Sequence, residues 1–319
     1  MRFGLTALFS LAALPAASDP LLGLPIDCTL GETCYIQQYV DRDASEGARD
    51  FACGRLSYDG HKGTDFAVPT LEAMRAGVNV IASAPGVVRG IRDGVEDRVY
   101  GPDNAEAVAG RECGNGVVLE HEDGWETQYC HMKQGSVRVR RGDRVERGDV
   151  LGQVGISGKA QFPHVHLSVR RDGAVVDPFD TGALAACGQD GHSLWQDTIA
   201  YVPGGLIDAG FTDNVPEYEA VQDGTVTAEH LPADAPAIVL FVLAYGGRAG
   251  DTLRLTIDGP GGRFLAQDMK LDRDQARLFR ATGRRAGSSN WPVGAYNGEI
   301  TLLREGRELD RIATQVVVK

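Results

Sequence analysis

Two pairs of residues in the first half of the chain have types and spacings suited to chemistry. His61 and Asp65 lie four positions apart in "YDGHKGTDFAV", and His164 and His166 lie two positions apart in "FPHVHLSV". Side chains at even separations on a β-strand point to the same face. We therefore expect each pair to converge on a single point.

A further histidine lies in "TQYCHM", between these two motifs. The pattern places His131 at the end of a hairpin strand, and Tyr129, two residues earlier, is expected to share its face. The chain thus offers a fourth imidazole in addition to the three of the two pairs.

Imidazole and carboxylate groups in such numbers are typical of a catalytic zinc site. Zinc in these sites takes three protein ligands and keeps a fourth position for water, whose pKa falls from about 15.7 to about 7. Imidazoles that do not bind the metal can accept a proton from that water, return one to a leaving amine, or donate a hydrogen bond to the developing oxyanion. The pattern predicts metal-assisted hydrolysis of an amide.

Each motif also has a purely structural interpretation. A buried hydrogen bond between His61 and Asp65 explains that pair alone as well as metal binding does. The occurrence of three motifs together favours a functional site. The remaining histidines, His121, His192 and His230, are interpreted as ordinary surface or capping residues.

Residues 52–180 contain many short apolar runs broken by Gly and Asp-Gly turns, which predicts antiparallel β structure. A short helix is expected in "TLEAMRAG", with Thr70 as its N-cap. Arginines alternate with valines at 137–149, and we interpret this run as the solvated face of a hairpin, in preference to an anion-binding role.

The length of the chain, 319 residues, favours a division into domains. Residues 216–319 carry strand candidates separated by turns at intervals typical of a β-sandwich, of immunoglobulin-like or fibronectin-III-like type. The predicted division is a signal peptide at 1–18, an N-terminal disulfide-containing extension at 19–51, a catalytic domain at 52–180, a linker at 181–215 and the accessory β-sandwich at 216–319.

The first residues predict export. They combine an early Arg2, an apolar stretch and small residues near position 18, as in a secretory signal peptide. The apolar runs are too short for a membrane span, so we expect a soluble protein in the periplasm or outside the cell. A formal charge of −12 argues against nucleic acid or an anionic membrane as a main partner. The oligomeric state is left open.

Six cysteines in an exported chain favour disulfides over reactive thiols or zinc thiolates. Cys113 and Cys130 flank a predicted hairpin with its turn at Asp123-Gly124, so they are expected near each other. Cys28 and Cys34 could close a small loop, which would leave Cys53 to pair with Cys187.

The motifs together resemble a known enzyme family. "HKGTDFA" at 61–67, "GNGVVLEHEDGWETQYCHM" at 114–132, "RRGDRVERGDVLGQVGISG" at 140–158 and "PHVH" at 163–166 stand in the order of the lysostaphin/LytM-type zinc metallopeptidases, which cut peptidoglycan cross-links. The resemblance covers roughly residues 52–180. It implies a compact fold of antiparallel β-sheets with an open groove.

The resemblance also implies roles for the five side chains. His61, Asp65 and His166 would hold one zinc ion per chain, and His131 and His164 would be the catalytic histidines. One of these two would be the general base and the other an electrostatic stabiliser, and the resemblance does not assign the two roles.

Two stretches depart from the family pattern. Residues 92–113 form a longer and more acidic connection than usual, which predicts a lid, a groove wall or a plain surface loop. In "KAQFPHVH", Gln161 and Phe162 replace the small Thr-Gly that family members commonly have, so substrate preference cannot be inherited from the family.

The sequence therefore predicts a secreted zinc-dependent metalloendopeptidase that acts on peptide bonds in peptidoglycan stems or cross-bridges. The alternative is a non-catalytic or autoinhibited wall-binding regulator of another hydrolase. A third interpretation, two histidines and a carboxylate as an iron oxygenase site, leaves His131 and His164 without a role.

Overall fold

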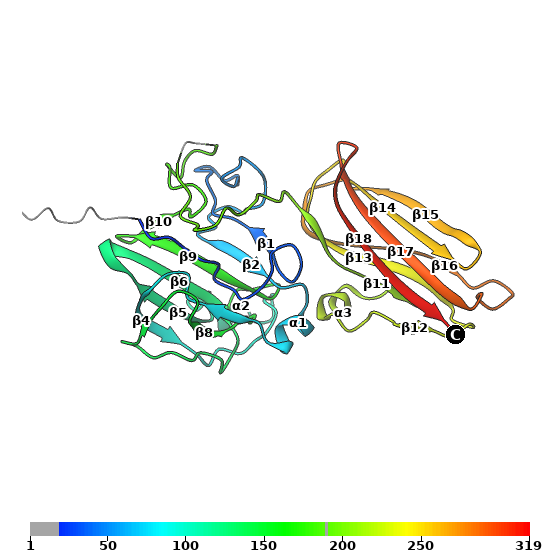
Figure 1. Cartoon of the computed structure of the whole chain (residues 1–319), viewed down its shortest axis with the longest axis horizontal. Coiled ribbons are helices and arrows are strands. Elements are labelled where there is room, and N and C mark those ends of the chain that lie inside the picture. The colour runs from blue at the N-terminus through cyan, green and yellow to red at the C-terminus, as the bar shows by residue number, and fades with distance from the viewer. Residues whose placement is uncertain (1–18, 189–190) are drawn as a thin grey trace, which may run out of the picture.

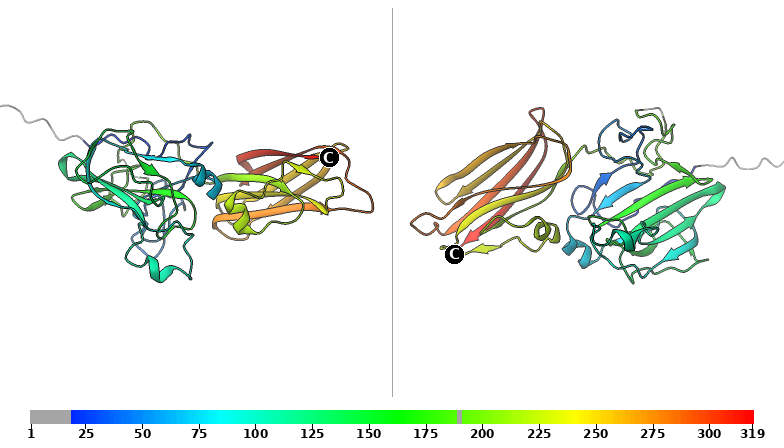
Figure 2. Two further views of the ribbon diagram at one scale, coloured as in Figure 1. Left: turned by 90° about the horizontal axis from the view of Figure 1, so that it is seen from below. Right: turned by 180° about the vertical axis from the view of Figure 1, so that it is seen from behind.

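The computed structural model describes residues 19–188 and 191–319, which form two β-rich lobes joined side by side (Figures 1 and 2). Antiparallel strands dominate both lobes, so the prediction of a mainly β protein is confirmed. The predicted signal peptide at 1–18 lies outside the described residues.

The first lobe is built on a large sheet that carries the predicted site. Along the sheet the strands follow the order β1-β2-β9-β6-β5-β4-β7, and β10 pairs with β9. Their bounds are β1 Tyr35–Gln38, β2 Thr64–Ala67, β9 His164–Arg171, β6 Trp125–Met132, β5 Asn115–Glu120, β4 Gly86–Arg92, β7 Arg144–Val145 and β10 Ala174–Val176. Neighbouring strands in this sheet run antiparallel, as the turn-rich sequence predicts.

A small second sheet and short helices complete this lobe. The small sheet pairs β3 (Asn79–Ile81) with β8 (Val150–Gln153). The predicted helix is α1 (Leu71–Ala76), and the Thr70 hydroxyl accepts a hydrogen bond from the amide of Ala73 as its N-cap. The segment 92–113 carries α2 (Ala105–Val108), and a single 3-10 turn, Glu122–Gly124, joins β5 to β6.

The second lobe contains a smaller and a larger sheet. The smaller sheet orders β11 (Gly205–Thr212), β13 (Ala237–Gly247) and β16 (Gln275–Arg285). The larger one orders β12 (His230–Leu231), β18 (Arg307–Val318), β17 (Gly294–Arg304), β14 (Thr252–Gly259) and β15 (Gly262–Lys270). Buried side chains from both sheets, such as Leu240 and Ile300, belong to one hydrophobic cluster. The immunoglobulin-like or fibronectin-III-like type of this lobe stays a prediction.

Strands also occur in the segments predicted as extension and linker. β1 lies in the extension predicted at 19–51 and pairs with β2. β11 lies in the linker predicted at 181–215 and pairs with β13 of the second lobe. The short helix α3 (Tyr218–Asp223) follows β11 and faces α1 across the junction of the lobes. The boundaries between the predicted domains remain predictions.

The six cysteines all lie in the described ranges and form the three expected disulfides, Cys28–Cys34, Cys53–Cys187 and Cys113–Cys130. The last of these joins the beginning of β5 to β6. It therefore lies directly beside the predicted catalytic histidine of that strand.

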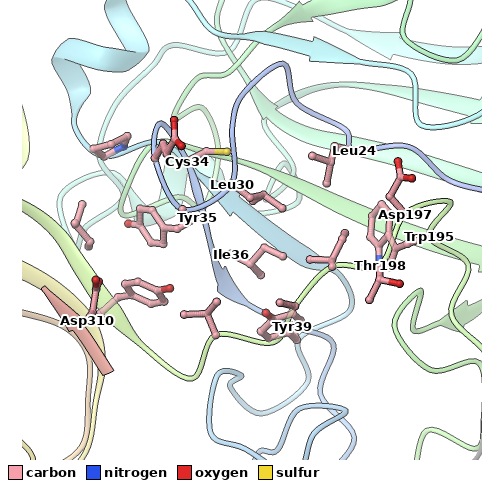
Figure 3. A pocket seen from close by; sticks show the side chains of 18 of the residues that line it. Leu24, Leu30, Cys34, Tyr35, Ile36, Tyr39, Trp195, Asp197, Thr198 and Asp310 are labelled. Carbon is pink, nitrogen blue, oxygen red and sulfur yellow. The ribbon is translucent and has the colours of Figure 1, made fainter. Parts of the chain in front are cut away.

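A pocket of about 510 Å³ lies where the N-terminal segment, the linker and the second lobe meet (Figure 3). Tyr35, Ile36 and Tyr39 of the β1 region and Trp195 of the linker line it, and Asp310 contributes from the second lobe. None of the five predicted site residues lines this pocket.

Within the ranges that the structure describes, every helix is too short or too polar to cross a membrane.

Candidate metal centre and catalytic groove

Strand pairing brings three of the five predicted side chains to one place. In the register of β2 with β9, Asp65 lies opposite His166 and Ala67 lies opposite His164. Because His164 and His166 are two residues apart on β9, both imidazoles emerge on the face that carries Asp65. This convergence agrees with the spacing argument.

His61 reaches the same point by a different route from the one expected. The strand β2 begins only at Thr64, so His61 and Asp65 do not share a strand face. His61 lies in the turn before β2, where its amide donates to the carbonyl of Tyr58. A Cβ atom on Gly63 would lie 2.4 Å from Nε2 of His166, so glycine lets this turn pass close to the second imidazole.

The ligand atoms of His61, Asp65 and His166 form a small triangle. Nε2 of His61 lies 3.2 Å from Oδ1 of Asp65 and 3.1 Å from Nδ1 of His166. Nδ1 of His166 lies 2.8 Å from the same Asp65 oxygen. Atoms at these separations can all bind one ion with metal–ligand bonds of about 2.0–2.2 Å. These three residues form a group that could hold a metal.

Each of the two predicted histidine ligands, His61 and His166, is oriented through its other ring nitrogen. Nδ1 of His61 donates to the Tyr39 carbonyl at 2.7 Å, and Nε2 of His166 contacts Oγ of Ser168 at 3.0 Å. Such partners fix the tautomer and the orientation of a ligating imidazole. Neither partner is predicted from the sequence, although the position of Ser168, two residues after His166 on one strand, is a usable signal.

We predict that Ser168→Ala weakens zinc binding about 10–100-fold, because His166 loses the acceptor that orients it. Competition with a chromophoric chelator measures the affinity. Ser136→Ala, which removes a hydroxyl that accepts from the amide of Gln153 elsewhere in the lobe, is the matched control. Equal zinc affinity of the Ser168→Ala protein and the control would contradict the prediction.

A β-bulge directs His131 into the site. Cys130 and His131 together oppose Gly116, and His131 has a φ of 62°, in the left-handed region that non-glycine residues rarely adopt. The expectation that Tyr129 shares the face of His131 was wrong, because the bulge rotates the two side chains apart. Tyr129 is buried in the core, and its hydroxyl accepts a hydrogen bond from the amide of Ser83.

The two predicted catalytic histidines lie side by side. The ring centroids of His131 and His164 are 4.6 Å apart. Nδ1 of His131 donates to the Ser157 carbonyl and Nδ1 of His164 to the Phe162 carbonyl, each at 2.8 Å. Both hydrogen bonds leave Nε2 as the free basic nitrogen, and Nε2 of His164 lies 3.5 Å from Oδ1 of Asp65.

The Cys113–Cys130 disulfide anchors this bulge, because the Cys113 carbonyl accepts a hydrogen bond from the amide of His131. Replacing both cysteines by serine should lower the free energy of unfolding by about 3 kcal/mol, as expected for a closed loop of this length. Urea titration of the oxidised protein and the variant measures the difference. A variant as stable as the parent would show that the bulge holds without its disulfide.

Burial and mutual contact set the ionisation of the site residues. Burial alone would raise the pKa of Asp65, but His61, His164 and hydrogen bonds from the imidazoles hold it well below its usual range. Burial lowers the pKa of His131 well below its usual range, and the neighbouring imidazoles of His164 and His166 add a smaller electrostatic effect in the same direction. Burial lowers the pKa of His164 as well. The carboxylate is therefore charged while His131 and His164 are neutral bases at neutral pH.

A groove of about 830 Å³ opens over these residues. Asp65, His131, His164 and His166 lie in its lining, and His61 lies behind them against Tyr58. Tyr100 of the 92–113 segment lines it too, so this segment contributes to a groove wall. The other three histidines, His121, His192 and His230, are absent from the lining.

Comparison with known proteins identifies one matching region. Residues 59–178 match the model of peptidase family M23. This range contains all five predicted site residues and most of the large sheet.

Curated relatives match over the same region. The chain is 32% identical over 120 residues to the DD-carboxypeptidase/endopeptidase Mpg of Neisseria meningitidis, covering 37% of this chain and 22% of that protein. It is 32% identical over 109 residues to the peptidoglycan DD-endopeptidase ShyA of Vibrio cholerae, covering 34% of this chain and 20% of that protein. The chain thus spans about a fifth of the length of each of these relatives.

Among solved structures, the chain is similar to the catalytic domain of a mutant of the prophage-encoded M23 protein EnpA from Enterococcus faecalis. The identity is 28%, the TM-score is 0.31, and the match covers 51% of this chain and 97% of that one.

Proposed function

We propose that this chain, whose residues 59–178 match the model of peptidase family M23, is an exported zinc-dependent endopeptidase that hydrolyses peptide bonds in the stems or cross-bridges of peptidoglycan. The observation that carries the proposal is the convergence of His61, Asp65 and His166 beside two further imidazoles in one groove. Relatives named as peptidoglycan DD-endopeptidases support the class of substrate.

The donor set suits zinc. Two imidazole nitrogens and one carboxylate oxygen are a ligand combination of catalytic zinc sites. When bound, zinc would act as a Lewis acid and lower the pKa of a coordinated water. Two of the ligands are supplied in deprotonated form, because Asp65 is charged and burial lowers the pKa of His166. Burial would also lower the pKa of His61, but the neighbouring Asp65 raises it, so any proton on that imidazole would be released when the metal binds.

His131 and His164 supply the proton transfers. Each has Nδ1–H held by a backbone carbonyl, so each offers the lone pair of Nε2 to the groove. One of them can accept the proton of the attacking water and return it to the leaving amine. The other, once protonated, can donate a hydrogen bond to the oxyanion of the tetrahedral intermediate. Because both histidines offer Nε2 to the groove in the same way, either one can transfer the proton and the other can stabilise the oxyanion.

Export is part of the proposal. The pattern of the first 18 residues supports it, as do disulfides that persist in oxidising compartments. Peptidoglycan lies on the outer side of the cytoplasmic membrane, the side to which export would deliver this chain.

Mass spectrometry of the products released from purified peptidoglycan tests the proposal, with the chain from residue 19 onwards as the enzyme. We expect new amine and carboxylate termini at one peptide bond, and their loss with a chelator. Intact peptides after incubation with folded, zinc-loaded protein would overturn the proposal and point to the wall-binding regulator.

A further inference from the structure

The second lobe forms one wall of the catalytic groove. Tyr218 and Gln222 of α3 and Arg273, Gln275 and Arg277 at the start of β16 line the same groove as the site histidines. A cartoon of the chain shows this end of the second lobe directed at the first (Figure 1).

Specific contacts hold this wall in place. Nε2 of Gln37 in β1 donates to the carbonyl of Ala276 at 2.8 Å, and Arg55 forms an ion pair with Asp274 at 2.5 Å. The rings of Tyr35 and Tyr245 pack with centroids 4.6 Å apart. The start of β16 is therefore docked beside the groove at several points.

Arg277 has an unusual environment within this wall. All its side-chain nitrogens are buried, and none has a hydrogen-bond partner within the part of the chain that the structure describes. A buried cation without partners is costly. Its guanidinium carbon lies 5.1 Å from the centroid of the Phe162 ring, a cation–π contact that offsets part of this cost.

Phe162 in turn contacts His164 twice. Its ring stacks on the imidazole with centroids 4.4 Å apart and planes inclined by 26°. Its carbonyl accepts the hydrogen bond from Nδ1 of His164. The position of Phe162 therefore determines both the tautomer and the orientation of this histidine.

We propose that Arg277 is a positioning residue: it holds Phe162 in place, and Phe162 orients His164, so the second lobe completes the catalytic site. The proposal rests on the proposed function in assigning a catalytic role to His164. It also gives a physical role to Phe162, which departs from the small residues expected at that place.

Turnover kinetics on a defined peptidoglycan peptide test this inference. Arg277→Met should lower kcat about 10–100-fold, the range typical of residues that orient a catalytic group, with KM changed less than about twofold and zinc content unchanged. Arg277→Lys keeps a cation near the ring and should recover most of the loss.

Arg55→Gln is the matched control, because it removes the ion pair with Asp274 at the same junction without touching the Arg277–Phe162 contact, and Arg55 does not line the groove. We expect its kcat to match the parent. An Arg277→Met protein with parental kcat, or an Arg55→Gln protein that loses as much, would overturn the inference, the latter by showing that only docking of the lobes matters.

A readout independent of turnover separates this inference from the proposed function. Side-chain ¹⁵N NMR of the histidines should show His164 with its proton on Nδ1 in the parent and a mixture of tautomers in Arg277→Met. If the parent cleaves no peptide but the tautomer changes as expected, the proposed function fails and the positioning role stands. An unchanged tautomer in Arg277→Met overturns the positioning role.

Discussion

His131→Ala should retain bound zinc and lose turnover by about 10²–10⁴-fold, the usual contribution of general acid–base catalysis. The reason is geometric: His131 is not a member of the His61, Asp65 and His166 triangle, yet its imidazole lies 4.6 Å from that of His164 in the groove. Metal analysis of the purified variant and cleavage of peptidoglycan peptides measure the two quantities separately.

His61→Ala provides the contrasting result. Removing one of three ligands should empty the metal site, so metal content and turnover fall together. His192→Ala removes an exposed histidine that contacts Asp19 outside the groove and should change neither quantity. An empty metal site in the His131→Ala protein would contradict this division between ligands and catalytic histidines.

The sequence predicted the convergence of the site because strand periodicity is a local property. His164 and His166 lie on one face of β9, as their spacing requires, and Asp65 pairs with His166 across the sheet. His61 was placed on the same strand as Asp65, but β2 begins after it. The two side chains nevertheless lie together, because the turn before β2 brings the His61 imidazole to within 3.2 Å of Asp65.

Features that depend on pairing between distant residues could not be predicted. The bulge that rotates His131 away from Tyr129 exists because two residues of β6 oppose only Gly116 of β5. The acceptors for the histidines include carbonyls of Tyr39 and Ser157, and a backbone carbonyl leaves no mark on the residue type. The contact of Arg277 with Phe162 likewise joins two lobes whose docking no local pattern encodes.

Arg42 is another residue whose role became visible only in three dimensions. Its guanidinium is buried and contacts a carboxylate oxygen of Asp177 at 3.2 Å. It also donates to the carbonyls of Asp180 at 2.6 Å, Ala183 at 2.9 Å and Ala186 at 2.5 Å. One side chain thereby fixes the segment that follows β10 and leads to the Cys53–Cys187 disulfide.

Arg42→Met should therefore lower the free energy of unfolding by about 3–5 kcal/mol, the usual cost of removing one partner of a buried ion pair. The variant keeps the apolar stem but leaves the Asp177 carboxylate and several carbonyls without their donor. Denaturant unfolding with the disulfides intact measures the loss. Arg49→Gln, which breaks the partly exposed pair with Asp43, should cost less than about 1 kcal/mol.

The pH dependence of this loss distinguishes a missing charge partner from a simple packing defect. Burial raises the pKa of Asp177 to about 6 even beside Arg42. A carboxyl whose pKa is higher in the folded state contributes stability at low pH that is lost as the pH rises through the folded value. Without Arg42 that pKa should rise further, so the deficit of Arg42→Met relative to the parent should grow as the pH rises above about 6. If the deficit does not change with pH, Arg42 stabilises the fold through its packing and its hydrogen bonds to backbone carbonyls. Its positive charge would then not stabilise the Asp177 carboxylate.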